Sequence, residues 1–233
     1  AALAYGIHNL DGEARFLVFD LGGGTFDVSI VEIFEGIIEV RASTGDNRLG
    51  GEDFNEVLID MMREQFAGEW GEAGKGEDAL YQKLREAAER ARRTLSTEDA
   101  EMAVSWRDKP YSLAISQARF EERAAPLIDR LREPVLRALR DANLTPESLN
   151  EIILIGGATR MPVVRKAVTR MFGRFPNTTV NPDEAVALGA AVQAGLKARD
   201  AALKEVVVTD VCPYSLGINT ARDLPGGAVE DGV

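Results

Sequence analysis

The sequence predicts a mixed α/β fold, and three features of the chain predict it. Three segments rich in β-branched and aromatic residues, at 16–20, 26–33 and 37–42, follow one another across short turns and indicate a β-meander. Segments with helical apolar spacing then dominate the middle of the chain. Finally, an apolar strand at 152–155 leads through a turn into a helix, which is the order of a β–α crossover.

Glycines mark the ends of the first predicted elements. Residues 1–6 have the pattern of a helix end, and a polar turn at 8–13 precedes the meander. After the third strand, a glycine-bearing loop at 45–53 leads into a helix near 54–65, where apolar residues recur at helical spacing. Gly- and Glu-rich residues 67–78 indicate a flexible surface connection.

The middle of the chain combines two long helices with a pair of short strands. A highly charged helix is expected at 78–95, and strands at 100–106 and 111–115 follow it. Ser116 is the expected N-cap of a long helix that runs to about residue 141. Two prolines are expected to bend or restart this helix: Pro126 and Pro134.

After the strand at 152–155, a Gly-Gly turn at 156–157 precedes a helix. This helix is expected to begin at Pro162, because proline fits the first helical turn, and to end at Phe172 before Gly173.

The Asn-Pro-Asp sequence at 181–183 is expected to cap a further helix at 184–199. Its small residues at 188–191 would allow close packing against a sheet. A short apolar segment at 206–209 follows, and the last dozen residues are turn-rich.

Composition excludes several classes of protein. The 233-residue chain has a net charge of −11, which argues against a nucleic-acid binder or a protein that binds anionic membranes. No apolar run approaches the roughly 20 residues of a membrane span. The single cysteine, Cys212, excludes an internal disulfide and makes the cytoplasm the expected compartment, and the single histidine, His8, excludes a two-histidine zinc motif. The start without an initiator Met suggests a fragment of a longer protein.

Residues 17–27 carry the most informative chemistry of the chain. An apolar strand runs into Asp20, then into three adjacent glycines, then into a threonine and Asp27. Without Cβ atoms, the turn lets backbone N–H groups approach a phosphate closely. The two carboxylates are then placed to hold a hydrated divalent cation that shares those phosphates. A plain Gly-Gly hairpin turn is the alternative interpretation of this segment.

Two further segments could bind a nucleoside, although each has an ordinary structural interpretation. In residues 89–96, helical spacing places four side chains on one face that could meet a ligand: Glu89, Arg92, Arg93 and Ser96. A guanidinium on this face could stack on a purine while a carboxylate or hydroxyl binds the ribose, but a solvated helix with Glu–Arg pairs has the same spacing. The turn at 156–160 could expose bare backbone to an adenine ring or could be a simple strand-to-helix turn. Neither a P-loop nor a G-x-G-x-x-G fingerprint occurs in the chain.

Taken together, these segments resemble the DnaK-type seventy-kilodalton heat-shock chaperones, which belong to the actin-like ATPase superfamily. Residues 19–29 resemble the second phosphate motif of this family, and 45–54 resemble the loop that enters its upper subdomain. Residues 89–96, 153–162 and 181–191 resemble its adenosine-clamping helix, its adenosine motif and the helix that closes its nucleotide pocket. The five motifs occur in order and span about residues 1–220.

The resemblance implies roles for particular residues. Asp20 and Asp27 would act in catalysis by coordinating magnesium, mainly through water, together with nearby potassium ions, and the turn that follows Asp20 would hold the β- and γ-phosphates of ATP or ADP. The phosphate-binding residues would be Gly22, Gly23, Gly24 and Thr25. The adenosine side would be lined by Gly51, Glu89, Arg92, Arg93, Ser96, Gly156, Gly157, Arg160 and Asp183. Two residues depart from the family pattern: Arg92 replaces a usual lysine and Ala158 a usual serine.

The resemblance also implies a domain organisation. Residues 1–44 and 124–204 would form the lower subdomain of an actin-like, ribonuclease H-like lobe, and 45–123 would form an inserted α+β upper subdomain. Residues 205–233 would be an interdomain linker and the start of a peptide-binding domain, with Thr209 replacing an apolar linker residue. The Cys-Pro-Tyr sequence and the short upper subdomain resemble the HscC-like branch.

The implied function is that of half an ATP-driven chaperone. The family's first lobe, with its own phosphate loop and catalytic lysine, is absent from these residues, so the fragment alone is not expected to hydrolyse ATP. The implied partners are unfolded peptide segments, a J-domain cochaperone and a nucleotide exchange factor. A sugar kinase or a structural actin-like protein of the same superfamily is the alternative, and the linker-like segment at 206–218 favours the chaperone over both.

Overall fold

The structure is a computed structural model of the chain. It describes residues 2–6, 12–73, 78–177, 179, 181–200, 203, 207–212, 217–218, 220–223 and 229–232. The expected polar turn after the first helix lies largely outside the described residues, as do His8 and part of the expected flexible connection at 67–78.

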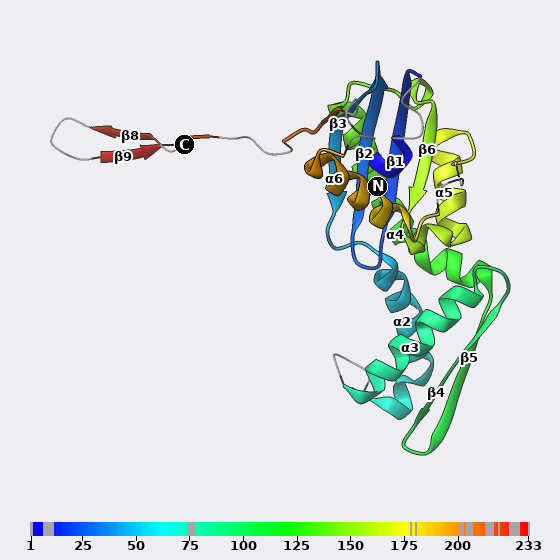
Figure 1. The fold of residues 1–233 in the computed structure, drawn as a ribbon. Coiled ribbons are helices and arrows are strands. Elements are labelled where there is room, and N and C mark those ends of the chain that lie inside the picture. Colours follow the sequence, from blue (N-terminus) through cyan, green and yellow to red (C-terminus); the bar gives the residue numbers. More distant parts are fainter. Residues whose placement is uncertain are drawn as a thin grey trace.

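A five-stranded mixed sheet forms the centre of the larger part of the molecule, in the order β6-β1-β2-β3-β7 (Figure 1). Its strands are β1 (Ala14–Leu21), β2 (Phe26–Phe34), β3 (Ile37–Asp46), β6 (Glu151–Ile155) and β7 (Val207–Thr209). The first three form the expected antiparallel meander, whereas β6 runs parallel to β1 and β7 runs parallel to β3. The mixed α/β class and the β–α crossover predicted from the sequence are therefore confirmed.

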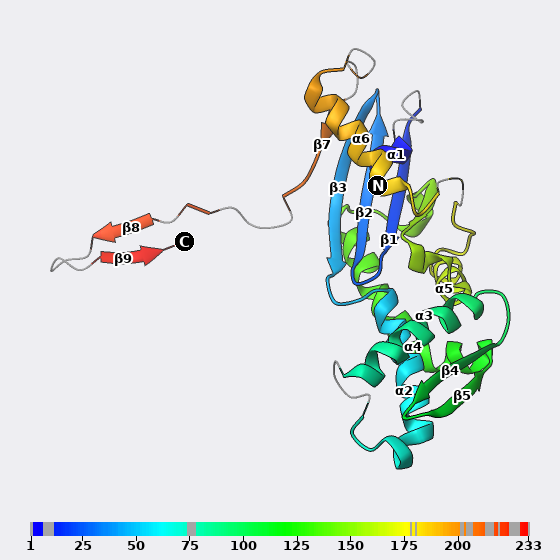
Figure 2. The same cartoon turned by 60° about the horizontal axis from the view of Figure 1, so that its bottom comes forward.

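Helices cover both faces of this sheet. On one face, α4 (Gln117–Asp141) and α5 (Pro162–Phe172) pack on apolar side chains such as Leu17 and Phe19 of β1. On the other face, α1 (Ala2–Gly6) and α6 (Ala185–Ala198) cover Phe16 and Val18, the alternate residues of the same strand (Figure 2). The period of two along β1 therefore assigns its side chains to two separate clusters.

The inserted segment lies below the sheet in Figure 1. It consists of α2 (Gly51–Trp70), α3 (Ala79–Thr94) and the antiparallel pair β4 (Ala100–Trp106) and β5 (Lys109–Ile115). Asp78 caps α3 by accepting the Tyr81 N–H at 2.7 Å, and Ser116 caps α4 by accepting the Arg119 N–H at 3.2 Å. The N-cap predicted at Ser116 is confirmed.

Two helices differ from their predicted form, and α2 (Gly51–Trp70) also extends into the stretch expected to be a flexible connection. Helix α2 begins at Gly51, three residues before the expected start, because the Asp53 carboxylate accepts the Gly50 N–H at 2.7 Å and closes a first turn ahead of the apolar pattern. Helix α4 runs without a restart through Pro126 and Pro134. Burial of its apolar face outweighs the hydrogen bonds that the prolines remove.

The small-residue stretch of α6 packs differently from the prediction. Gly189 is buried, but Leu188, Ala190 and Ala191 are exposed, and Val186 is 55% exposed. Only one side of this helix therefore packs on the rest of the chain.

The C-terminal segment leaves the sheet after β7. Two antiparallel strands, β8 (Thr220–Asp223) and β9 (Val229–Gly232), form a separate hairpin that lies away from the sheet in both views (Figures 1 and 2). Two short 3₁₀ turns, η1 (Pro146–Ser148) and η2 (Gly157–Arg160), flank β6. Among the described residues, no helix is both long and apolar enough to cross a membrane.

Candidate functional site

The glycine turn between β1 and β2 caps helix α2 with its carbonyl groups. Gly22 O accepts the Gly51 N–H at 2.9 Å, and Gly23 O accepts the Glu52 N–H at 2.7 Å. These carbonyls satisfy two N–H groups that the first turn of a helix otherwise leaves free. The glycine turn therefore fixes where α2 begins.

Three consecutive backbone donors of this region are free. The Gly22 N–H bonds to Thr25 O at 3.0 Å, but within the described residues the N–H groups of Gly23, Gly24 and Thr25 have no hydrogen-bond partner. All three residues are exposed. Successive unpaired N–H groups in a turn form a concave site that favours an anion.

Two other backbone segments touch this turn at glycines. A Cβ on Gly50 would lie 2.4 Å from Gly23 O, so only glycine permits the contact between the start of α2 and the turn. On the other side, Gly156 has a φ of +84°, and a Cβ there would lie 2.2 Å from Leu21 O. The parallel strands β1 and β6 end together, with Asp20 opposite Ile155, which brings the two glycine turns to the same edge of the sheet.

Asp20 and Asp27 face each other across the first two strands. They are register partners in the antiparallel pair of β1 and β2, so their side chains lie on the same face of the sheet. Asp20 is partly buried and Asp27 is exposed. Burial raises the pKa of the Asp20 carboxyl above its ordinary value, and the negative charge of Asp27 raises it further. A cation between the two carboxylates would relieve this repulsion.

A cavity of about 770 Å³ lies beside the glycine turn. The structure brings ten of the predicted site residues together around it: Gly22, Gly23, Gly51, Glu89, Arg92, Arg93, Ser96, Gly157, Arg160 and Asp183. Five predicted residues do not line it: Asp20, Asp27, Gly24, Thr25 and Gly156. Asp27 lines a second hollow of about 650 Å³ between the end of β3 and α4. Asp27 therefore faces a different hollow from the predicted adenosine residues.

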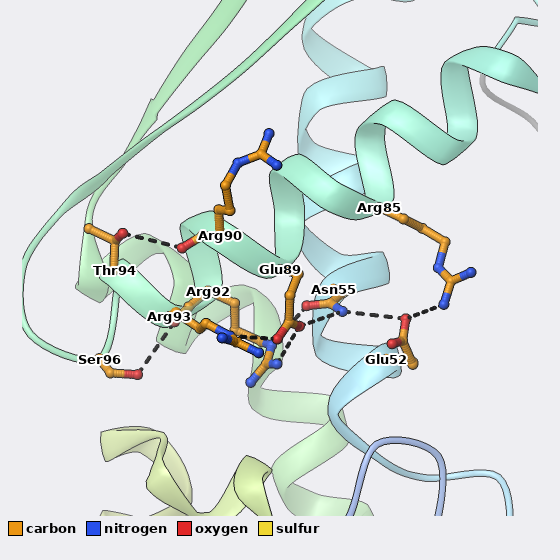
Figure 3. Close-up of polar contacts among 9 residues, drawn as sticks. All are labelled: Glu52, Asn55, Arg85, Glu89, Arg90, Arg92, Arg93, Thr94 and Ser96. Atoms are coloured by element: carbon orange, nitrogen blue, oxygen red, sulfur yellow. Dashed lines mark hydrogen bonds and ion pairs between the residues drawn. The ribbon is translucent and has the colours of Figure 1, made fainter.

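An arginine–glutamate cluster on α3 forms one wall of the cavity (Figure 3). Glu89 accepts a hydrogen bond from Arg92 Nη2 at 2.5 Å and another from Arg93 Nε at 2.8 Å. Burial acts to raise the pKa of the Glu89 carboxyl, but the hydrogen bonds from both guanidinium groups and from Asn55 outweigh it and lower this pKa to about 2. Glu89 is therefore ionised at neutral pH and holds both arginines on the cavity side of the helix.

The opposite wall comes from the segment after β6. Arg160 of η2 forms an ion pair with Asp183 at 2.5 Å, and both side chains are exposed. Gly157 lies beside the Asp183 carboxylate, since a Cβ on this glycine would be 3.6 Å from Asp183 Oδ1. The side chain of Ser96 donates to Arg92 O at 3.4 Å at the rim of the cavity.

Sequence reasoning missed several residues of this site. Five lining residues were not predicted as site residues: Glu52, Thr97, Ala158, Met161 and Arg165. Asn55 was also missed, although it binds both Glu89 and Arg92. Asn55 lies one helical turn after Gly51, near the predicted entry loop, but the same spacing fits a residue that faces solvent. In the described part of the chain, no group of three or more His, Cys, Asp or Glu side chains is arranged to hold a metal ion.

Comparison with known proteins gives consistent matches over nearly the whole chain. The family model described as Hsp70 protein matches residues 1–230. The chaperone protein DnaK of Thermotoga petrophila is 45% identical over 240 residues, which cover 99% of this chain and 40% of the relative. The DnaK proteins of Thermotoga sp. strain RQ2 and Thermotoga maritima match with the same identity and coverage. The chain thus spans about 40% of the length of the curated relatives that it matches.

We expect the replacement Gly156→Ala to lower the free energy of unfolding by about 2 kcal/mol or more, because an L-residue is strained at positive φ and its Cβ would strike Leu21. Urea denaturation of the chain measures the loss. Gly23→Ala is the matched control, since a Cβ there meets no atom within 4 Å, and its effect should stay within about 0.5 kcal/mol. Equal losses in the two variants would contradict the contact described here.

Asp20→Asn should raise the melting temperature of the nucleotide-free chain at pH 7 in the presence of a chelator. Because the folded state raises the pKa of Asp20, ionisation of this carboxyl costs stability as the pH rises through and above its ordinary range. The advantage of the Asn variant should therefore shrink as the pH falls below the ordinary value of 3.8. Asp129→Asn, at an exposed position on α4, is the control. A melting temperature that falls at pH 7 would show that Asp20 is not repelled.

Proposed function

Because the chain belongs to the Hsp70 protein family, we propose that it is the C-terminal lobe of the ATPase domain of a molecular chaperone. In this proposal, the lobe binds ATP or ADP with magnesium, and the full protein couples ATP hydrolysis to the binding and release of peptides. The observation that carries the proposal is the position of the cavity, which joins a glycine turn with free backbone donors to a wall of guanidinium groups.

The turn fits the phosphate groups of a nucleotide. The three free N–H groups at Gly23, Gly24 and Thr25 supply donors for phosphate oxygens, and the glycines permit close approach. Asp20 and Asp27 would hold magnesium, mainly through its bound water, and potassium ions nearby. The pairing of Asp20 with Asp27 across β1 and β2 supports this assignment, since a cation would compensate two opposed carboxylates. Magnesium would supply charge neutralisation of the phosphates.

An adenosine group would fit between the two walls of the cavity, which are the arginine–glutamate cluster on α3 and the segment after β6. Arg93 is 76% exposed, so its guanidinium can stack on a purine ring, while Glu89 and Ser96 can bind the ribose hydroxyls. Gly51 and Gly157 present backbone without side chains to the same space, and Gly156 supports the turn from behind. Arg160, held by Asp183, closes the far side.

Hydrolysis would require a second lobe. The cavity is bounded here by one lobe, and stabilisation of charge on a transferring phosphate needs donors around the whole group. The isolated chain is therefore proposed to bind nucleotide without turning it over. The chain covers 40% of the length of its relatives. The other 60% leaves room for a first lobe and a peptide-binding domain.

Strand β7 supports the proposed coupling. Residues 207–209, predicted as an interdomain linker, pair with β3 as an edge strand, and Val208 packs against the α6 side of the sheet. Thr209 is exposed and lies opposite Glu39. A linker that docks as a strand in one nucleotide state would transmit that state to the peptide-binding domain. The J-domain cochaperone, the nucleotide exchange factor, the cytoplasmic location and the HscC-like branch remain predictions.

In the full-length protein, Arg93→Ala should weaken ADP binding by about tenfold in calorimetry, the loss expected for one cation–π contact. Arg90→Ala is the matched control, because Arg90 is on the same helix and points away from the cluster (Figure 3).

Wild-type protein that binds no ADP, or an Arg93 variant that binds it unchanged, would contradict the proposed adenosine site. ATP turnover by the isolated chain at the rate of the full-length protein would contradict the requirement for a second lobe.

A further inference from the structure

Asn55 is a buried amide that joins the two helices of the inserted segment beside the cavity. It is only 1% exposed, on α2, and it faces α3 (Figure 3). Its Oδ1 accepts a hydrogen bond from Arg92 Nε at 2.8 Å, and its Nδ2 donates to Glu89 Oε2 at 3.1 Å. A weaker bond runs from Nδ2 to Glu52 Oε2 at 3.4 Å. The amide is thus satisfied on both its oxygen and its nitrogen.

The chemistry of its partners fixes the orientation of this amide. An arginine guanidinium can only donate hydrogen bonds, so the Asn55 atom that faces Arg92 Nε must be the oxygen. An ionised carboxylate can only accept, so the atom that faces Glu89 must be the nitrogen. The lowered pKa of Glu89 keeps this carboxylate ionised at neutral pH. The pattern leaves Asn55 one arrangement, and that arrangement sets the position of Arg92.

Arg92 is held at two nitrogens along one edge of its guanidinium group. Asn55 binds Nε and Glu89 binds Nη2, and the side chain is only 12% exposed. A Cβ on Gly51 would lie 3.8 Å from Arg92 Cζ and 3.6 Å from Gly22 O. The guanidinium therefore lies where α3, the start of α2 and the glycine turn meet, on the wall of the cavity.

Arg93, the next residue on the helix, is held less firmly than Arg92. Its side chain is 76% exposed and is held through Nε by Glu89 alone. An exposed arginine loses side-chain entropy when a ligand immobilises it, whereas a buried guanidinium held at two of its nitrogens has already lost that freedom on folding. Of the two guanidinium groups on this wall, only that of Arg92 is preorganised.

We propose that Asn55 is a positioning residue, which fixes the Arg92 guanidinium against the cavity wall and so preorganises the surface that receives the nucleoside part of the nucleotide. This inference rests on the proposed function and deepens it. The phosphate turn is not involved, because its contacts to α2 are made by the backbone of Gly51 and Glu52. Loss of Asn55 should therefore weaken nucleoside recognition and spare phosphate recognition.

The test compares ADP with inorganic pyrophosphate in calorimetry of the full-length protein with magnesium. Asn55→Leu, which keeps the approximate volume of the side chain, should weaken ADP binding five- to tenfold and leave pyrophosphate binding within twofold. In a double-mutant cycle, Asn55→Leu should have little further effect on ADP binding once Arg92 is replaced by Ala, because it acts through Arg92.

Two variants separate positioning from a merely structural role. Tyr81→Phe removes the Tyr81–Glu56 hydrogen bond, which joins the same two helices away from the cavity, so it should lower the melting temperature without changing ADP affinity. Asn55→Ala removes the same hydrogen bonds without adding bulk, so it should weaken ADP binding by a similar five- to tenfold, even where Asn55→Leu is too unstable to measure.

Equal effects of Asn55→Leu and Tyr81→Phe on ADP binding, additive losses in the cycle, or unchanged ADP affinity in Asn55→Ala would overturn the proposal. Wild-type protein that binds pyrophosphate but not ADP would overturn the proposed function as well, so the two failures are distinguishable.

Discussion

Contact between bare backbones at the glycine turn of residues 22–24 is the constraint on which the rest of the structure depends. Gly50 and Gly156 press against this turn from two sides at distances that no Cβ could occupy. The turn's carbonyls cap α2, which fixes where the inserted helices leave the sheet, and the N–H groups of Gly23, Gly24 and Thr25 have no partner within the described residues. The same turn thus determines the placement of the insertion and carries the anion-binding donors.

Electrostatics divides the site around this turn into two parts. On one side, burial and the facing charge of Asp27 raise the pKa of Asp20, so this part favours a cation. On the other side, Glu89 is a strong anion that organises two guanidinium groups, and its lowered pKa reflects their hydrogen bonds. A nucleotide bound with magnesium carries both kinds of charge, and the turn between the two parts supplies neutral backbone donors.

Much of this could be predicted from the sequence, because local signals marked it. Pro162 and Gly173 delimited α5 to the residue, since proline fits the first helical turn and glycine the left-handed position after the last. The start of α2 was missed because its cap is a bond from the Gly50 backbone to Asp53, which apolar spacing does not reveal. Asn55 was missed because a single polar residue on an amphipathic helix has the same pattern whether it faces solvent or a buried arginine. The pairing of β7 with β3 joins distant parts of the chain, so no local pattern could show it.

The central claim, that the free N–H groups of the turn hold phosphate, is tested most directly by amide NMR of the labelled chain. Titration with magnesium and ADP, and separately with pyrophosphate, should shift the amide signals of Gly23, Gly24 and Thr25 more than those of other residues. Adenosine alone should leave these three signals in place and shift signals on α3. Shifts of the turn amides with adenosine but not with pyrophosphate, or no shift of these amides with any of the three ligands, would contradict the account.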